Sequence, residues 1–373
     1  MTYLDNAATT PVTDIVFDAI KPYLTSNFSN PSAIYSSARQ ARQAVEKARA
    51  QVATAIGAEP SQIFFTSGAT ESNNIVCRQF DHIICSNIEH PSIKGIEFKV
   101  LSCGNWLRDI EEIATALKKE RPKDKTLISC QWVNNETGYI LPVHNIWRLA
   151  HDLKLPFHTD ATQAFGHVPI NVNILRCDFL SLSGHKFHAP KGVGVLYIKE
   201  PDKFKSDIVG GGQEKGIRSG TENVAGIVGI GVAAENYQYE YSRYGDPTHN
   251  YLIKCKRLLI ERLKNSLWAD RIMINSPDDS KHTANIVNIS IKGVEGESML
   301  LLLDNKGFCV SAGSACHSGD IRKSKVLDAL GVPDDYAYGT IRVSMSNETD
   351  ISQINAFCDA LFDILCAVRL YRW

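Results

Sequence analysis

The sequence has no excess of charge of either sign and no long apolar run. Forty lysines and arginines are matched by forty-one aspartates and glutamates, which gives a formal net charge of -1 at pH 7. Such a balance excludes a global basic field that would hold nucleic acid or an anionic membrane non-specifically. No stretch approaches the roughly 18 consecutive apolar residues of a membrane-spanning helix. We therefore expect no membrane association and no direct binding of nucleic acid.

The chain also lacks a secretory signal and closely spaced cysteines. It begins Met-Thr-Tyr-Leu-Asp-Asn, with neither a basic segment nor a hydrophobic segment following it. Its ten cysteines are scattered, and none belongs to a Cys-x-x-Cys pair, so no structural zinc site or other metal site is expected. Without a signal, we expect the cysteines to be reduced thiols and the protein to be cytoplasmic.

The length and the order of apolar patterns predict a two-domain α/β protein. A chain of 373 residues is too long for one compact domain, and 44% hydrophobic with 22% charged residues excludes a mostly disordered chain. Short β-type runs such as Thr126–Gln131 and Phe179–Ser183 alternate with helical patterns such as Ser36–Ile56. This alternation favours a mainly parallel sheet covered by helices on both faces. In such sheets, ligands bind beyond the carboxyl ends of the strands.

The alternation is interrupted at a tyrosine-rich segment, Asn236–Tyr251, which has no clear period. We interpret this segment as an irregular connection that leads into a helix, after which a smaller α+β unit follows. The predicted large domain therefore spans residues 13–240. The predicted small domain combines residues 1–12 with residues 250–373.

Three polar motifs follow predicted strands in the large domain. Lys186 comes after Ser-Gly-His at a strand end, Asp160 comes just after another strand, and the turn Ser67–Thr70 joins a strand to a helix. Alone, such a lysine is usually a surface charge and such a carboxylate a helix cap. Together they are what pyridoxal phosphate chemistry needs: a lysine that attaches the cofactor and an acid that keeps the pyridine nitrogen protonated. Backbone N–H groups at a helix N-terminus would bind the phosphate.

These motifs belong to a longer series by which the sequence resembles the cysteine desulfurases, the class V branch of the fold type I pyridoxal-phosphate enzymes. The segment around Cys316, with its distance to Arg342, is similar to the NifS- and IscS-like group with a long catalytic loop, which includes iron–sulfur assembly enzymes. The matching segments are Tyr3–Thr10, Phe65–Asn73, Glu89–His90, Val133–Gly138, Asp160–Gln163, Ser183–Lys186, Gly210–Glu214, Arg218–Thr221 and Gly313–Cys316.

The resemblance implies the fold, the cofactor and the site residues. It implies a fold type I transferase whose large domain has a mainly parallel, seven-stranded type of sheet, beside a smaller α+β C-terminal domain. It further implies pyridoxal 5'-phosphate as cofactor, L-cysteine as substrate, and a homodimer with Thr221 acting across the interface. Lys186 and His90 would move protons, and Asn135 and Arg342 would bind the substrate. The implied cofactor-binding residues are Ala69, Thr70, His90, Asn135, Asp160, Gln163, Ser183, Gly184, His185, Lys186 and Thr221.

Cys316 is the candidate for the sulfur-carrying nucleophile. It lies among small residues, in Gly313–Gly319, that are typical of a loop exposing a thiol rather than of a core. The expected reaction converts L-cysteine to L-alanine, holds the sulfur as a persulfide on Cys316 and passes it to a sulfur-acceptor protein. Whether His317 lowers the pKa of the thiol stays open, as does the pathway served: iron–sulfur cluster assembly, tRNA thiolation or DNA phosphorothioation.

Two alternatives compete with this interpretation. Another class V enzyme, such as a selenocysteine lyase or an aminotransferase, would share most motifs, but transamination has no use for the thiol of Cys316. A non-catalytic scaffold that only binds partners would have no need of Lys186, Asp160 and His90 together.

Overall fold

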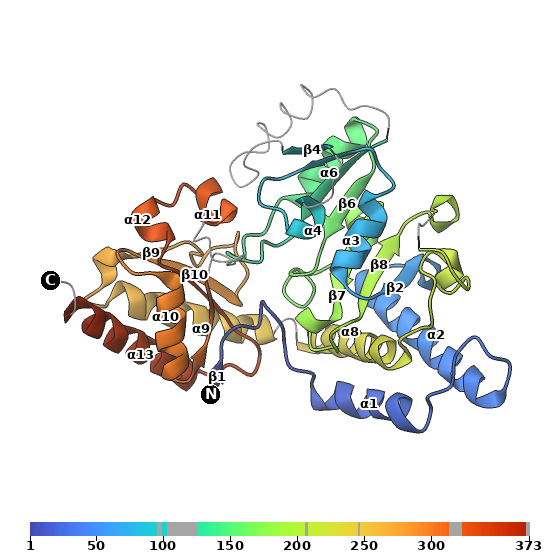
Figure 1. The fold of residues 1–373 in the computed structure, drawn as a ribbon, viewed down its shortest axis with the longest axis horizontal. Coiled ribbons are helices and arrows are strands. Elements are labelled where there is room, and N and C mark those ends of the chain that lie inside the picture. Colours follow the sequence, from blue (N-terminus) through green and yellow to red (C-terminus); the bar gives the residue numbers. More distant parts are fainter. Residues whose placement is uncertain (95–98, 103–124, 206–207, 245–246, 313–322, 371–373) are drawn as a thin grey trace. The chain divides into compact units, whose positions relative to one another are not determined.

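The structure is a computed structural model, and it describes residues 1–94, 99–102, 125–205, 208–244, 247–312 and 323–370 (Figure 1). The predictions for Cys316 and His317 therefore lie outside the described residues. The chain divides into two compact units. Unit 1 comprises Met1–Thr9, Val133–Ile140 and Asp246–Trp373, and unit 2 comprises Thr10–Trp132 and Leu141–Gly245.

Unit 2 is built on a seven-stranded sheet in the order β2-β8-β7-β6-β5-β3-β4. Only β8 runs antiparallel to its neighbours, so the predicted mainly parallel sheet is confirmed. Buried runs of apolar residues are what a sheet covered on both faces requires. The strands are β2 (Ile63–Thr66), β3 (His82–Cys85), β4 (Lys99–Ser102), β5 (Thr126–Gln131), β6 (Phe157–Asp160), β7 (Phe179–Ser183) and β8 (Gly194–Ile198).

Helices of unit 2 follow from amphipathic patterns and glycine stops. The long helix α2 buries Ala41, Val45 and Val52 on one face and ends at Gly57, whose φ of 69° is the left-handed conformation that favours glycine. Helices α1, α2 and α8 pack together beside the sheet (Figure 1). The helices are α1 (Asp14–Thr25), α2 (Ser36–Ile56), α3 (Ala69–Cys77), α4 (Pro91–Lys94), α6 (Val143–Asp152), α7 (Val172–Leu175) and α8 (Val224–Tyr244), with short 3-10 helices η1 (Pro60–Gln62), η2 (Gly184–Lys186), η3 (Pro201–Lys203) and η4 (Glu214–Gly216).

The prediction of an irregular connection over Asn236–Tyr251 was wrong. Helix α8 continues through most of this tyrosine-rich segment to Tyr244, and α9 (Pro247–Lys264) begins at its proline. Within α8, the centroid of the Tyr237 ring lies 5.2 Å from that of Phe165, so this tyrosine packs on the interior of unit 2. A proline in the first turn is compatible with a helix because its missing N–H would have no intrahelical partner there.

Unit 1 contains a four-stranded antiparallel sheet in the order β12-β13-β10-β9 and a two-stranded parallel sheet of β1 and β11. Helices α9, α10 and α13 bury Leu259, Leu303 and Phe357 in one hydrophobic core against the sheet. The strands are β1 (Thr2–Tyr3), β9 (Ile272–Ile274), β10 (Ile286–Ile291), β11 (Phe308–Cys309), β12 (Ser311–Ala312) and β13 (Thr340–Ser344). The remaining helices are η5 (Ala269–Arg271), α10 (Gly296–Asn305), α11 (Lys325–Ala329), α12 (Asp334–Ala337) and α13 (Ile351–Leu370).

The segment Val133–Ile140 belongs to unit 1, although the sequence placed it inside the large domain. Its backbone is bonded to the loop before β10: Thr283 N donates to Gly138 O at 2.8 Å, and Ile140 N donates to Lys281 O at 2.7 Å. Gly138 has a φ of 71°, and a Cβ there would lie 2.6 Å from Thr283 Oγ1. A turn this close to its neighbour needs glycine.

Helix α13 contains the one window among the described residues, Ile351–Val368, that is long and apolar enough to cross a membrane by length and composition alone. The sequence showed no uninterrupted apolar run here because Asp359 and Asp363 divide it. Leu361 and Leu365 of this helix are buried in the core of unit 1. Its apolar face is thus used for packing within the unit.

Candidate active site

A continuous chain of hydrogen bonds links Asp160 to His90 in unit 2. Asp160 ends β6 and is 7% exposed. The amide of Asn73 donates to Asp160 Oδ2 at 2.7 Å and to Ser92 Oγ at 2.9 Å, and Ser92 Oγ lies 2.8 Å from His90 Nδ1. Ser92 N also donates to His90 Nδ1, at 3.1 Å, so that nitrogen is the acceptor and a neutral ring carries its proton on Nε2. The chain therefore fixes both the orientation and the tautomer of His90.

Electrostatic coupling places Lys186 in the same site. Burial lowers the pKa of His90, the charge of Asp160 opposes this effect, and the charge of Lys186 adds to it. The charges of Asp160 and Lys186 thus both act on His90, although the three residues lie far apart in the sequence. A neutral histidine that carries its proton on Nε2 can donate that proton to a group placed beside it.

Lys186 is held by a short 3-10 helix directly after β7. Gly184 begins this helix, and a Cβ there would lie 3.0 Å from Ala189 and 3.1 Å from Val193. Thr10 anchors the helix, since its N and Oγ1 donate to His185 O at 2.8 and 3.0 Å. Burial, then the charges of Lys186 and Lys191, lower the pKa of the His185 side chain to about 4. His185 is therefore neutral at physiological pH and can donate one hydrogen bond to an anion.

The turn between β2 and α3 is shaped for an anion. Gly68 caps α3, and the backbone N–H groups of Ala69 and Thr70 have no acceptor among the described residues. Ser72 Oγ lies 2.8 Å from Thr66 Oγ1 and bonds to Val195 O at 3.2 Å, which fixes the turn from the inside. A Cβ on Gly194 of β8 would lie 2.5 Å from Gly68 Cα. The turn can therefore lie across β8 only because position 194 is glycine.

In unit 1, the guanidinium of Arg342 is held from three sides. Its Nη1 donates to Asn135 O at 2.8 Å, and its Nη2 donates to Asp5 Oδ1 at 2.7 Å and to Ser311 Oγ at 3.1 Å. Ser311 Oγ in turn donates to Asp5 Oδ1 at 2.7 Å. Arg342 is 7% exposed, and its buried Nε has no hydrogen-bond partner among the described residues. A fixed, buried guanidinium with a spare donor can bind a carboxylate.

The turn that follows Val133 presents Asn135 and Glu136 to this arginine. Asn134 shapes it, since its Oδ1 accepts from Glu136 N and Thr137 N, both at 3.0 Å. Glu136 Oε2 accepts a hydrogen bond from Ser324 Oγ at 2.5 Å. Burial raises the pKa of Glu136 to about 7, although Ser324 and Arg342 act in the opposite direction.

The predicted site residues fall into two groups. Unit 2 contains Thr70, His90, Asp160, Lys186 and their neighbours Ala69, Gln163, Ser183, Gly184 and His185, whereas unit 1 contains Asn135 and Arg342. Thr221 is exposed in unit 2, and Cys316 lies outside the described residues. Among those residues, no cluster of three histidines, cysteines or acids could hold a metal ion, and the described cysteines, which exclude Cys103 and Cys316, are free thiols.

Sequence reasoning missed the residues that orient the others. Asn73 and Ser92 link Asp160 to His90, and Asp5 pairs with Arg342. Asn73 and Asp5 stand inside the motifs that carried the resemblance, so their motif membership was the available signal. Ser92, one residue after Pro91, gave no such signal.

Comparisons with known proteins identify the family of the chain. The family model for class V aminotransferases matches residues 2–357. The chain is 39% identical to the cysteine desulfurase IscS of Methanosarcina thermophila over 98% of this chain and 92% of that protein. A NifS-like protein from Rickettsia africae has a TM-score of 0.87 at 32% identity, with 98% of this chain and 99% of that chain covered. A structure of SspA in complex with cysteine has a TM-score of 0.75 at 30% identity, with 94% and 100% covered.

The chain therefore belongs to the class V aminotransferase family, and within it to the cysteine desulfurases. Its cofactor is pyridoxal 5'-phosphate, and the described residues fit that group. The turn offers two backbone N–H donors at Ala69 and Thr70, and Asp160 is a buried carboxylate linked by hydrogen bonds to His90, on which the charge of Lys186 also acts. Asn73 Oδ1 and Thr162 Oγ1 are buried polar atoms with no partner among the described residues, as expected beside a site that binds a polar group.

Proposed function

We propose that this protein is an L-cysteine desulfurase that converts L-cysteine to L-alanine and carries the sulfur as a persulfide on Cys316. The observation that supports this most is the linked set of Asp160, Asn73, Ser92 and His90 beside Lys186. That set suits pyridoxal phosphate chemistry, and the relatives that share the chain's full length are named cysteine desulfurases.

The residues of unit 2 hold the cofactor. When bound, pyridoxal phosphate supplies an electron sink for the substrate carbon next to the amino group. Asp160 would keep the pyridine nitrogen protonated, because a buried carboxylate stabilises a nearby positive charge. Ala69, Thr70, Ser183, Gly184 and His185 would bind the phosphate. Gln163 would hydrogen-bond the ring oxygen, a role that the resemblance also implies for Asn135 of unit 1.

Lys186 would attach the cofactor and would move protons at the substrate carbon. His90 takes part from its Nε2, the nitrogen left available by the bonds to Ser92. Because the neutral ring of His90 carries its proton on Nε2, it can donate that proton near pH 7. The amide of Asn73 holds Asp160 and Ser92 at once, so it couples the acid to the histidine.

The substrate carboxylate would be bound by Arg342, whose guanidinium is already fixed by Asp5 and Asn135. The thiolate of Cys316 attacks the substrate sulfur. The carbon–sulfur bond breaks with its electron pair staying on carbon, which is protonated to give alanine, and the sulfur stays on Cys316 as a persulfide. L-cysteine as substrate is supported by the relative solved in complex with cysteine.

We also propose an oligomeric state, a sulfur acceptor and a cellular location for the protein. We propose a homodimer in which Thr221 contributes to the phosphate site of the other subunit, and a protein acceptor for the persulfide sulfur. The iron–sulfur pathway is the first acceptor pathway to test because similar proteins are named IscS and NifS-like. A cytoplasmic location is proposed as well, and fractionation of host cells tests it.

The decisive test separates cofactor binding from sulfur transfer. Cys316→Ser should still bind pyridoxal phosphate and L-cysteine, detected by visible absorption, because those steps use other residues. It should release almost no sulfide, since a serine hydroxyl is far less acidic and a poor nucleophile toward sulfur. Cys366→Ser is the matched control, because Cys366 is an exposed thiol on α13. With sulfur-labelled cysteine, the label should appear on the Cys316 peptide of the wild type and of this control.

Three results would contradict the proposal. Wild-type sulfide release from Cys316→Ser would move the protein toward a lyase that needs no protein thiol, such as a selenocysteine lyase. If Lys186→Ala kept the absorption of the lysine-bound cofactor, another lysine would hold the cofactor. A wild-type protein that binds no pyridoxal phosphate would be a scaffold.

A further inference from the structure

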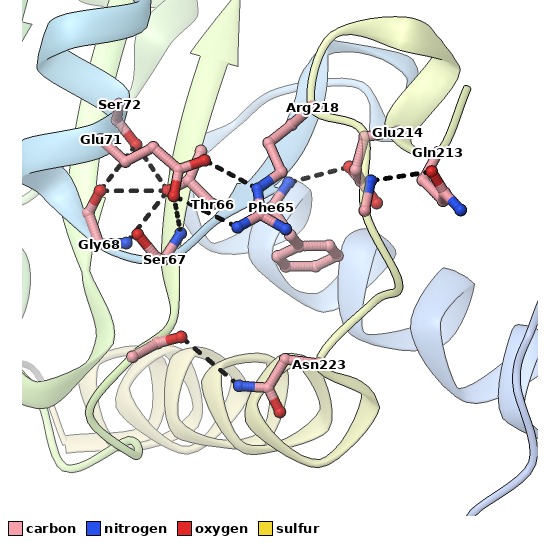
Figure 2. A network of polar contacts seen from close by, with 12 residues as sticks. Phe65, Thr66, Ser67, Gly68, Glu71, Ser72, Gln213, Glu214, Arg218 and Asn223 are labelled. Atoms are coloured by element: carbon pink, nitrogen blue, oxygen red, sulfur yellow. Dashed lines mark hydrogen bonds and ion pairs between the residues drawn. The ribbon is translucent and has the colours of Figure 1, made fainter. Parts of the chain in front are cut away.

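An ion pair lies directly behind the turn that binds the phosphate. Arg218 Nε donates to Glu71 Oε1 at 2.7 Å, and its Nη2 lies 3.4 Å from Glu71 Oε2 (Figure 2). Both side chains are mostly shielded from water, with 27% of Arg218 and 17% of Glu71 exposed. A partly buried arginine–carboxylate pair with two contacts is better fixed than an exposed one.

Glu71 is also a backbone cap of the turn. Its Oε2 accepts a hydrogen bond from Ser67 N at 2.9 Å, one residue before the glycine that caps α3. Burial raises the pKa of Glu71, but the bonds from Arg218 and Ser67 outweigh burial and leave the pKa lowered. Glu71 is therefore a full negative charge in the first turn of the helix whose N-terminus would bind the phosphate. Alone, such a charge would repel a phosphate dianion.

A second ion pair lies in the interior of unit 2, and the charge of its glutamate, Glu214, also acts on Arg218. Arg49 Nη1 and Nη2 donate to the two oxygens of Glu214 at 2.7 and 2.8 Å. Glu214 Oε2 also accepts from Phe65 N at 2.9 Å, on the strand that leads into the turn (Figure 2). Glu214, four residues before Arg218, is thus bonded through its side chain to the backbone of β2. The charges alternate along Arg49, Glu214, Arg218 and Glu71.

We propose that Arg218 is a positioning residue for the cofactor phosphate: it neutralises Glu71, so that Glu71 can cap the turn Ser67–Thr70 without repelling the phosphate. The proposal rests on the phosphate-binding role of this turn, and it adds a residue that need not touch the cofactor. It also explains why an acid can stand three residues after Gly68, where its charge would otherwise oppose anion binding.

The test measures cofactor affinity rather than turnover. Apo-protein is titrated with pyridoxal phosphate and, separately, with pyridoxal, which lacks the phosphate. Arg218→Gln should raise the Kd for pyridoxal phosphate by about tenfold, the effect of roughly 1.4 kcal/mol of uncompensated charge repulsion. Its Kd for pyridoxal should stay within about twofold of the wild type. Arg257→Gln is the matched control, because Arg257 pairs with Asp278 in unit 1.

The double variant Glu71→Gln/Arg218→Gln shows whether Arg218 acts by neutralising the charge of Glu71 or only by holding the fold. Its glutamine can still accept from Ser67 N, and no carboxylate remains, so the affinity for pyridoxal phosphate should return to within about threefold of the wild type. A double variant as weak as Arg218→Gln would overturn the proposal, since the pair would then serve only to hold the fold. An unchanged Kd in Arg218→Gln would overturn it as well. A wild type that binds pyridoxal and pyridoxal phosphate equally well would refute the phosphate-binding turn itself.

Discussion

Replacing Glu136 by glutamine should make unit 1 more stable at pH 8 and leave its stability nearly unchanged at pH 4. The pKa of Glu136 is raised from 4.5 to about 7 because burial disfavours the carboxylate more than Ser324 and Arg342 favour it. Between pH 4.5 and about 7, the folded protein binds more protons than the unfolded chain. The free energy of unfolding therefore falls as the pH rises through this range. Above pH 7 the buried Glu136 is ionised in the folded protein. This lowers the free energy of unfolding by about 3 kcal/mol, the value that corresponds to the difference in pKa.

Glutamine has the shape of the protonated acid and its Oε1 can still accept the hydrogen bond from Ser324. The assay is urea unfolding followed by circular dichroism at a series of pH values, with the difference between Glu136→Gln and the wild type plotted against pH. Other groups titrate alike in both proteins and cancel from this difference. Glu261→Gln, at an exposed position of α9, is the control. Equal pH dependence in Glu136→Gln and wild type, or a less stable variant at pH 8, would refute the reasoning.

Two further changes test packing and buried charge. Gly194→Ala should lower the melting temperature and weaken binding of pyridoxal phosphate, because a Cβ would lie 2.5 Å from Gly68 Cα and overpacking costs about 1–3 kcal/mol; an unchanged melting temperature would contradict the close approach. Lys256 is 1% exposed and donates to Thr283 O at 3.0 Å, and burial lowers its pKa to about 8. Between pH 8 and 10.5 the unfolded chain then binds more protons than the folded protein, so the free energy of unfolding of the wild type should rise from pH 8 to 10. Lys256→Met should lose this rise. An equal rise in both proteins would contradict the buried, neutral state of Lys256.

The sheet of unit 2 was predictable because its strands are short apolar runs between clear turn residues. Thr126–Gln131 and Phe179–Ser183 were predicted with the boundaries that β5 and β7 have. Strands buried on both faces are rich in apolar residues, although Ser129 and Ser181 are buried inside β5 and β7. Asp160 and Lys186 were noticed because Asp160 is the last residue of β6 and Lys186 comes three residues after the end of β7.

The contacts that orient the site could not be predicted, because they depend on how strands and loops meet in space. Asn73 and Asp160 are 87 residues apart in the sequence, yet one amide joins Asp160 to Ser92. The continuation of α8 to Tyr244 was missed for a similar reason: ring packing of Tyr237 on Phe165 stabilises a helix that has no clear apolar period of its own.

The pairing of β1 with β11 has a consequence for the order in which the chain can fold during synthesis. Thr2 and Tyr3 pair with Phe308 and Cys309, so the first strand of unit 1 has no partner until about 300 more residues have been made. At roughly 5–20 residues per second, this wait lasts on the order of 15–60 s. Residues 10–132 and 141–245 are all available before then, so unit 2 can form its sheet first. The amino-terminal segment, including the Asp5 that holds Arg342, is therefore among the last parts of the protein to reach its final place.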